Sequence, residues 1–204
     1  MFYSPGFSIK KGYELMQALN NYIKTYFPVP PADLEEIARQ FKPLALKKDD
    51  FFLKEDQYCD RLAFIGSGLM RIYRYADGKE VTQWISSAGY FVTDLASFVF
   101  DTPGRWNIQA LTDCELFSID RRAYQGLNAS IPKWAELDKL FIARCFIMLE
   151  ERVFTHLHLS AEARYQKLME QSPELFNLVP LQYLASMMGM TPETLSRIRA
   201  KMIS

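Results

Sequence analysis

Apolar residues spaced three and four positions apart mark two helices at the start of the chain. In residues 8–27 the apolar positions are Ile9, Tyr13, Met16, Leu19, Ile23 and Phe27. This spacing is typical of one face of an amphipathic α-helix. Residues 33–41 repeat the spacing, and Pro43 follows at a point where a proline ends a helix. We therefore predict an N-terminal helical extension over residues 1–30 and a second helix at the start of the next domain.

Between residues 44 and 119 apolar and polar positions alternate with a period of two, which is typical of strands. The predicted strands are residues 44–46, 51–53, 61–65, 69–75, 80–85, 106–111 and 114–119. Asp77-Gly78 predicts a hairpin turn, and residues 94–100 predict a short helix. Strands at this spacing predict an antiparallel β-roll of jelly-roll type over residues 31–131, within an α+β fold.

Helical spacing returns after the last predicted strand. Residues 121–127 predict a short helix, and residues 132–158 predict a long one whose apolar residues cover more than one face. One face should pack on the β-roll. The other has no partner within a monomer, so we expect a homodimer through this dimerisation helix. The predicted interface residues are Leu137, Phe141, Arg144 and Met148.

The last stretch, residues 159–204, predicts a helix-turn-helix domain. Gly189 ends one short helix because a tight turn needs a left-handed residue. Thr191 caps the next helix, and Pro192 suits its first position. The predicted apolar seam between them is Leu184, Ala185, Met188, Leu195 and Ile198. The alternative is an ordinary helical hairpin, which has no reason to carry a polar, arginine-bearing outer face.

That polar outer face predicts contact with double-stranded DNA, because a helix of this kind enters the major groove. Glu193 and Arg197 lie four residues apart on one face, where they can pair with cytosine and guanine edges. The predicted DNA-binding residues are Thr191, Glu193, Thr194, Ser196, Arg197, Arg199 and Lys201.

Composition narrows the class of protein further. The chain has 24 lysines and arginines in total and 24 aspartates and glutamates, so its net charge is zero. The basic charge that DNA binding requires is therefore local to the C-terminal helix. Three cysteines without a C-x-x-C pair predict a reduced cytoplasmic location. No run of 18 apolar residues and no apolar leader occur, so neither a membrane span nor a signal peptide is expected.

Candidate chemistry is sparse. His156 and His158 point apart on a helix, and with no third histidine we predict no metal site. Residues 150–152 are interpreted as a solvated helix face and Cys145 as a small core residue. No nucleophile elbow, P-loop or paired-carboxylate site is present, so the sequence predicts no enzyme.

Taken together, these segments resemble the Crp/Fnr-type transcription regulators. Residues 62–84, with Gly66, Gly68 and Asp77-Gly78-Lys79-Glu80, followed by Gly89, are similar to the cyclic-nucleotide-binding β-roll of that family. Residues 132–157 are similar to its dimerisation helix, and residues 193–197 to its base-contacting motif. The resemblance implies a dimeric regulator that binds an inverted-repeat duplex and contacts RNA polymerase. The family's β-hairpin wing is reduced or absent here, because only residues 172–178 are available for it.

The effector region departs from the family pattern. Thr93 stands where nucleotide-binding members have glycine, and Asp94 where they have glutamate. Gly104 falls at the position of their phosphate-binding arginine, and Arg105 comes one residue late. The resemblance places the effector pocket at Gly89, Thr93, Asp94, Leu95, Ala96, Arg105 and Trp106. We expect no cyclic AMP binding, so the pocket either takes another small molecule as effector or is a folded spacer.

Two other functions stay open at this stage. A ligand-sensing module could use the C-terminal helices for protein contacts, because the wing is missing. A β-roll enzyme of the cupin type would need a histidine-rich metal site, which this sequence does not offer.

Overall fold

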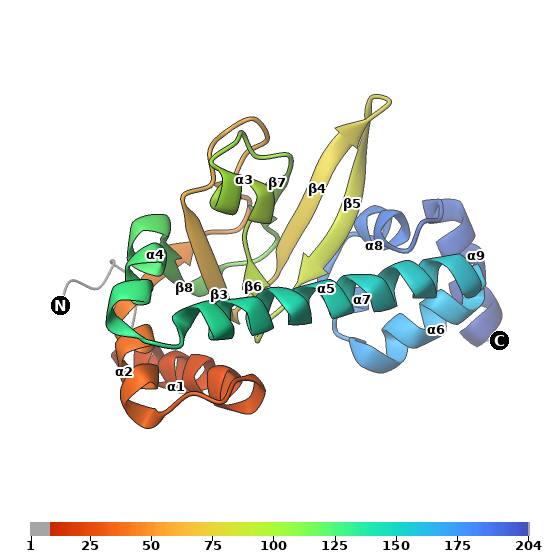
Figure 1. Ribbon diagram of the computed structural model, residues 1–204. Coiled ribbons are helices and arrows are strands. Elements are labelled where there is room, and N and C mark those ends of the chain that lie inside the picture. The colour runs from red at the N-terminus through yellow and green to blue at the C-terminus, as the bar shows by residue number, and fades with distance from the viewer. Residues whose placement is uncertain (1–8, 204) are drawn as a thin grey trace. The chain divides into compact units, whose positions relative to one another are not determined.

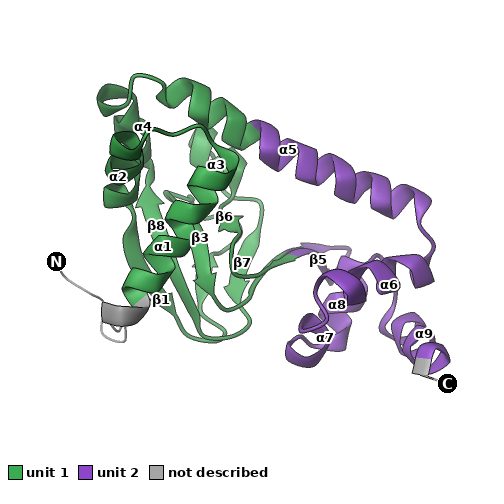
Figure 2. Ribbon diagram, turned by 90° about the horizontal axis from the view of Figure 1, so that it is seen from below, with its two compact units in different colours: residues 1–72, 85–142 green, residues 73–84, 143–204 purple. Residues whose placement is uncertain are grey.

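The computed structural model describes residues 9–203, and the side chains of residues 12–202. The chain divides into two compact units, one of residues 1–72 with 85–142 and one of residues 73–84 with 143–204 (Figure 2). The long helix α5 (Trp134–His158) begins in the first unit and ends in the second. The predicted absence of a signal peptide concerns residues before Ile9, which lie outside the described residues.

Two four-stranded sheets form the β-roll (Figure 1). The first has the order β1 (Lys42–Leu46), β8 (Cys114–Asp120), β3 (Arg61–Ser67) and β6 (Phe91–Val92), with every neighbouring pair antiparallel. The second has the order β2 (Phe51–Leu53), β7 (Asn107–Ala110), β4 (Met70–Ala76) and β5 (Lys79–Ser86). The predicted antiparallel β-roll and its seven strands are confirmed.

Strand β6 is the one that the sequence analysis missed. It has two residues, Phe91 and Val92, which pair with Phe64 and Ala63 of β3. Two residues are too few to establish a period, so only pairing identifies the strand. The predicted short helix follows it as α3 (Leu95–Phe100).

The N-terminal helices belong to the core of the first unit. Helices α1 (Ile9–Tyr26) and α2 (Pro31–Gln40) lie with α4 (Arg121–Ser130) and the start of α5 around the first sheet. One buried cluster joins them to the sheet, including Leu15, Leu19, Ile23, Leu34, Ile37, Leu62, Phe64, Phe117, Leu127 and Trp134. The described part of the predicted extension therefore contributes to the core, because burying these side chains removes them from water.

The second unit is mostly helical. After α5 come α6 (Ala161–Gln171), α7 (Leu175–Leu178), α8 (Leu181–Met187) and α9 (Pro192–Ile203). Ser160 caps α6 as expected, accepting a hydrogen bond from the Ala163 N–H at 3.2 Å. Residues 172–178 hold the short helix α7 with Leu175 buried, so within the described residues this segment forms no hairpin wing.

Two sequence interpretations are wrong. Cys145 is exposed on α5 instead of lying in the core. Arg152 does not belong to a solvated face, because its guanidinium lies 3.9 Å above the ring of Trp84 and donates to the Gln83 carbonyl at 2.5 Å. Both residues are on one long helix, and which side of such a helix is covered depends on distant parts of the chain.

Candidate functional site

Helices α8 and α9 form a tight pair whose turn is fixed by backbone geometry. Gly189 has φ +65°, a left-handed conformation that strains other residues. The Met190 N–H then donates to the Ala185 carbonyl at 3.0 Å, which satisfies the end of α8. Thr191 caps α9 by accepting from the Thr194 N–H at 3.2 Å. The predicted glycine turn and threonine cap are confirmed.

The apolar seam of this pair is buried as predicted. The five seam residues have exposed fractions between 0% and 4%: Leu184, Ala185, Met188, Leu195 and Ile198. Helix α9 also packs against α6. Because one side of α9 is fully used in packing, its other side is held in a fixed orientation toward solvent.

The solvent side of α9 carries most of the predicted DNA-binding residues. Glu193, Ser196 and Arg197 are exposed, as is Lys201 further along the helix. Arg199 is half-buried. Residues at positions i, i+3 and i+4 share one face of a helix, so the first three form a single polar strip, which we call the α9 strip.

The ends of the α9 strip differ in character. The pKa of Glu193 is lowered by hydrogen bonds from its own backbone N–H and from the Thr191 side chain. It is therefore an ionised acceptor at neutral pH, next to an arginine donor one turn later. Thr191 and Thr194 use their hydroxyls within the cap, where Thr191 donates to Thr194 at 3.3 Å. We interpret these two threonines as positioning residues for the strip.

In the predicted effector region, Asp94 is turned inward. Its side chain is buried, and Oδ1 accepts from the Ser97 N–H at 3.0 Å, which caps α3. Its Oδ2 accepts from the Arg105 N–H at 2.7 Å. The carboxylate therefore already occupies the amino end of α3, where an anionic ligand would meet like charge.

Gly104, which the sequence resemblance aligns with a phosphate-binding arginine, has no room for a side chain. A Cβ there would lie 2.9 Å from the Gln57 carbonyl oxygen and 3.0 Å from Cδ2 of Leu53. Arg105 has an exposed side chain, and Trp106 is half-buried against the core between the sheets.

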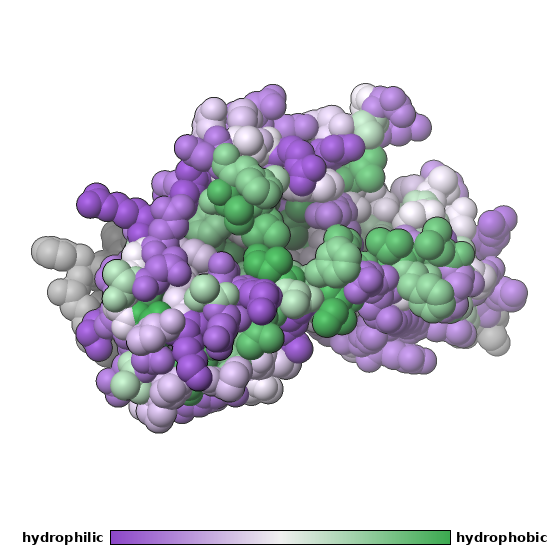
Figure 3. All heavy atoms as spheres, in the orientation of Figure 1, coloured by the Kyte–Doolittle hydropathy of each residue, from purple (hydrophilic) through white to green (hydrophobic). Residues whose placement is uncertain are grey.

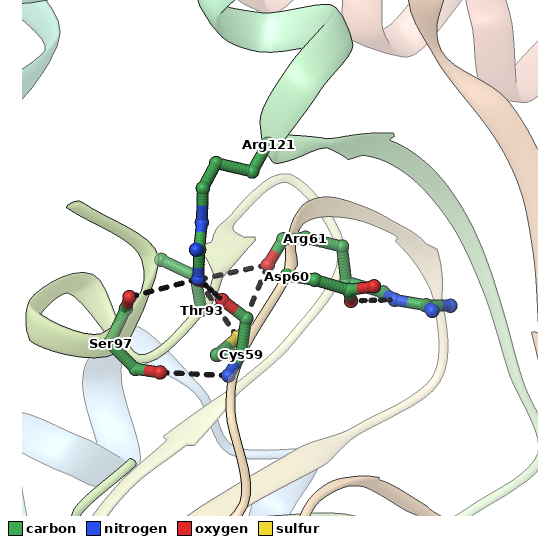
Figure 4. Close-up of polar contacts among 6 residues, drawn as sticks. All are labelled: Cys59, Asp60, Arg61, Thr93, Ser97 and Arg121. Carbon is green, nitrogen blue, oxygen red and sulfur yellow. Dashed lines mark hydrogen bonds and ion pairs between the residues drawn. The ribbon is translucent and has the colours of Figure 1, made fainter. Parts of the chain in front are cut away.

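An arginine that the sequence analysis did not single out organises the same region (Figure 4). Arg121 donates to the Cys59 carbonyl at 2.8 Å and to the Ser97 carbonyl at 3.1 Å, and it pairs with Asp101. The Cys59 N–H donates to the Ser97 hydroxyl at 2.7 Å. This network fixes α3 to the start of β3, and both terminal nitrogens of the Arg121 guanidinium are engaged within the chain.

Thr93 belongs to the same network. Its hydroxyl donates to the Arg61 carbonyl at 2.9 Å and lies 3.4 Å from the Cys59 sulfur. Arg61 itself pairs with its neighbour Asp60 at 2.9 Å. No local sequence signal marks these partners, because every pair in the network except Arg61 and Asp60 is at least 20 residues apart in the chain.

A mostly apolar cavity of about 220 Å³ lies beside α3. Its lining is Leu62, Leu95, Phe98, Val99, Phe100, Tyr124, Asp138, Phe141 and Ile142. Of the seven predicted effector residues, Leu95 lines this cavity and the other six do not. The one charged side chain in the lining is Asp138, which accepts from the Tyr124 hydroxyl at 2.5 Å. The cavity therefore suits an uncharged apolar group better than a phosphate.

Of the four predicted dimer residues, Leu137 is the one that the structure buries within the chain. Leu137 is buried in the core and Phe141 packs against it, while Arg144 and Met148 are half-buried. The rest of the helix surface carries large exposed apolar residues, which we call the α5 stripe: Leu140, Phe146, Ile147, Val153, Phe154 and Leu157 (Figure 3). The expected homodimer stays a prediction, and the burial of Leu137 is the one correction to its assigned residues.

Two further observations bear on the class of protein. Among residues 9–203, no helix is both long enough and apolar enough to span a membrane. Within the same part of the chain, no three histidine, cysteine, aspartate or glutamate residues are grouped as metal ligands.

Comparison with known proteins agrees with this architecture. Residues 43–130 match the cyclic nucleotide-binding domain family. Solved structures with a similar fold include CLP of Xanthomonas campestris, which is described as a c-di-GMP responsive global regulator. That structure has a TM-score of 0.65 and 15% sequence identity, and the match covers 85% of this chain and 91% of that one. No sequence in the search of curated proteins matched this chain.

Two other regulators share the fold. The catabolite activator protein of Thermus thermophilus has TM-score 0.54 and 20% identity, with coverage of 87% of this chain and 85% of that one. FixK2 of Bradyrhizobium japonicum has TM-score 0.63 and 15% identity, with coverage of 79% and 83%. The chain spans only 43% and 46% of two cAMP-bound kinase regulatory structures that it also resembles. The expected Crp/Fnr-type fold is confirmed.

Proposed function

We propose that this protein is a dimeric transcription regulator that binds specific double-stranded DNA. Its residues 43–130 match the cyclic nucleotide-binding domain family, and it shares the fold of Crp/Fnr-type regulators. The observation that carries the proposal is the α9 strip. It combines an ionised acceptor, a hydroxyl and a guanidinium on the exposed side of a helix whose other side is buried.

The strip has the chemistry of direct base recognition. A guanidinium can pair with both acceptors of guanine in the major groove, and a carboxylate can accept from the cytosine amino group. Arg197 and Glu193 lie one turn apart, close enough to address neighbouring base pairs. We propose that Ser196 lies beside them at a base edge, and that Arg199 and Lys201 contribute phosphate contacts.

A two-fold dimer requires an inverted-repeat site with half-sites about one helical turn apart. The α5 stripe is the surface that we propose for the dimer contact. We further propose that a small-molecule effector binds in the apolar cavity beside α3 and that the dimer contacts RNA polymerase. The bacterial cytoplasm is the compartment in which such a regulator would act.

The substitution Arg197→Ala tests whether the α9 strip contacts bases. We expect it to weaken binding to the selected site by about 1–3 kcal/mol, roughly 5- to 150-fold, and to relax the preference at one G·C pair. The site would first be obtained by selection from random duplexes with the unaltered protein, and affinities would then be measured by fluorescence anisotropy at one fixed salt concentration.

Two matched variants serve as controls for Arg197→Ala. Lys201→Ala removes a cation from the same helix and should weaken all duplexes about equally, without changing the selected motif. Arg122→Ala removes an exposed cation from α4 and should change neither affinity nor motif. If selection returns no inverted repeat, or if the motif survives Arg197→Ala unchanged, the proposal is wrong.

Cyclic AMP is not the proposed effector. The buried Asp94 carboxylate holds the amino end of α3, Gly104 leaves no room for an arginine, and Asp138 is the charged group in the cavity. We expect titration calorimetry to show no cyclic AMP binding at micromolar concentrations, with adenosine as a control for the base alone. A micromolar or tighter Kd for cyclic AMP would contradict this.

A ligand-sensing module with protein-binding C-terminal helices is the second candidate. The observation in its favour is the absence of a hairpin in residues 172–178, which hold α7 instead. It predicts that duplex binding lacks sequence preference, so the same selection experiment separates the two functions.

A further inference from the structure

A second cavity, of about 210 Å³, lies entirely within the second unit and away from the α9 strip. It is lined by the C-terminal part of α5, by α6, by the end of β5 and by the end of α8. The lining residues are Trp84, Glu151, Arg152, Thr155, His156, Arg164, Lys167, Leu168, Gln171, Met187 and Met188. Nothing in the proposed function uses this cavity.

The charge of the lining is strongly one-sided. Arg152, Arg164 and Lys167 are permanent cations at neutral pH, and Glu151 is the one carboxylate among the lining residues. Glu151 pairs with Lys167 at 3.4 Å, a long contact, and its side chain is largely exposed. An excess of positive charge therefore faces a partly enclosed space, where electrostatic interactions are stronger than in bulk water.

Arg152 is the most unusual member of the lining. Its guanidinium stacks on Trp84 and donates to a carbonyl, and no carboxylate within the described residues forms an ion pair with it. Burial lowers its pKa to about 10, so it remains charged at neutral pH without a counterion. Removing a cation from water without a paired anion is costly, so an anionic partner would be stabilising.

Arg164 adds a second incompletely satisfied guanidinium. It donates to the carbonyls of Leu159 at 2.8 Å and of His156 at 3.2 Å, which fixes it at the end of α5. The Nε atoms of Arg152 and Arg164 are both buried without an acceptor among the described residues. Buried donors are usually completed by an acceptor, a ligand or water, and Nε of Arg121, outside this cavity, also lacks an acceptor among the described residues.

The remaining lining is apolar or neutral. It includes the aromatic face of Trp84, the aliphatic side chain of Leu168 and the polarisable thioethers of Met187 and Met188. Both ring nitrogens of His156 lie near carbonyl oxygens, Nδ1 2.9 Å from that of Arg152 and Nε2 3.1 Å from that of Met187, and only a nitrogen that carries hydrogen donates to its neighbour. The cavity thus pairs a cationic wall with an apolar one.

We propose that this cavity is a binding site for a small organic anion, which places one carboxylate or phosphate group against Arg152, Arg164 and Lys167 and its apolar body against Trp84 and the two methionines. The volume fits a molecule of about ten non-hydrogen atoms. Because α8 provides Met187 and Met188, such a ligand bridges α5, α6 and α8. It should therefore stabilise the folded second unit.

Thermal unfolding with three probes tests the proposal. Inorganic phosphate, succinate and benzoate would each be added at about 10 mM, with ionic strength held constant by sodium chloride. We expect at least one probe to raise Tm above the chloride reference, and titration calorimetry of that probe to show saturable binding. Benzoate carries both a charge and a flat apolar body, so we expect it to give the largest shift.

Three variants locate the site. Lys167→Gln keeps a hydrogen-bonding group for Thr155 but removes the cation, and should weaken the active probe by about 10-fold. Arg152→Gln should weaken it at least as much, and Lys167→Gln alone decides the matter if Arg152→Gln fails to fold. Arg122→Gln, on the exposed side of α4, should leave binding unchanged.

Two results would overturn the proposal. One is the absence of any Tm shift beyond chloride with all three probes. The other is an equal shift in the unaltered protein and in Lys167→Gln, which would indicate general salt effects. Neither measurement uses DNA, so the outcome is independent of the proposed duplex binding.

Discussion

Replacing Ile147 with glutamate is expected to convert the protein from a dimer to a monomer. Ile147 is 62% exposed at the middle of the α5 stripe, with Leu140 and Phe154 seven residues away on either side. In a two-fold dimer each copy contributes its own charge, so the substitution would bury two like charges without partners. Leaving one buried charge uncompensated costs about 3–5 kcal/mol, which raises the dimer Kd by roughly 100-fold or more.

Sedimentation at micromolar concentration measures this directly. The unaltered protein should sediment at twice the chain mass of 23.7 kDa, and Ile147→Glu at the chain mass. Gln166→Glu adds the same charge on the exposed side of α6 and should remain dimeric. Circular dichroism would verify that Ile147→Glu is folded. A monomeric unaltered protein, or a dimeric folded Ile147→Glu, would exclude the α5 stripe as the interface.

Loss of the dimer should also weaken DNA binding. A single copy contacts one half-site, so its affinity for the inverted repeat should fall by at least about 100-fold, while a single half-site should be bound as before. This difference separates dimer loss from damage to the α9 strip, which would affect both duplexes.

Leu195→Ala is expected to cause the largest loss of stability in the second unit. Leu195 is 0% exposed, at the centre of the seam that α9 forms with α8. Truncating a fully buried leucine removes its transfer free energy and leaves a cavity, at a cost of about 2–5 kcal/mol in the free energy of unfolding. Because the seam orients α9, duplex binding should fall with the folded fraction.

Urea unfolding followed by circular dichroism measures the change. Leu178→Ala provides a matched control, since the same truncation at a leucine that is 55% exposed should alter stability by no more than about 0.5 kcal/mol. A loss below about 1 kcal/mol for Leu195→Ala would mean that the seam does not hold the helix pair together.

The sequence predicts most of the regular structure because its signals are local. Alternation with period two identifies seven strands, and spacings of three and four identify the main helices. Single residues fix the boundaries: Ser160 caps α6, Gly189 ends α8 at φ +65°, and Thr191 caps α9. Each of these depends on backbone geometry within a few residues, which the sequence carries directly.

The same local logic identifies the α9 strip, but it fails on the long helix. Helix α5 is apolar on more than one face, so its pattern cannot tell which face is covered. The structure buries Leu137, one of the predicted interface residues, and leaves Ile147 and Phe154 exposed. The choice is made by the β-roll and the N-terminal helices, which pack on one side of its start.

What the sequence by itself determined is therefore the order of the elements, the helix pair and its outward strip, and the altered effector cassette. Only the tertiary structure decided that Asp94 turns inward to α3, that Arg121 anchors that helix, and that Arg152 lies on Trp84 beside Arg164 and Lys167. The stacking of Arg152 on Trp84 joins residues 68 positions apart. Burial and pairing of a charged group depend on what surrounds it in space, and the spacing of residues along a chain does not contain that information.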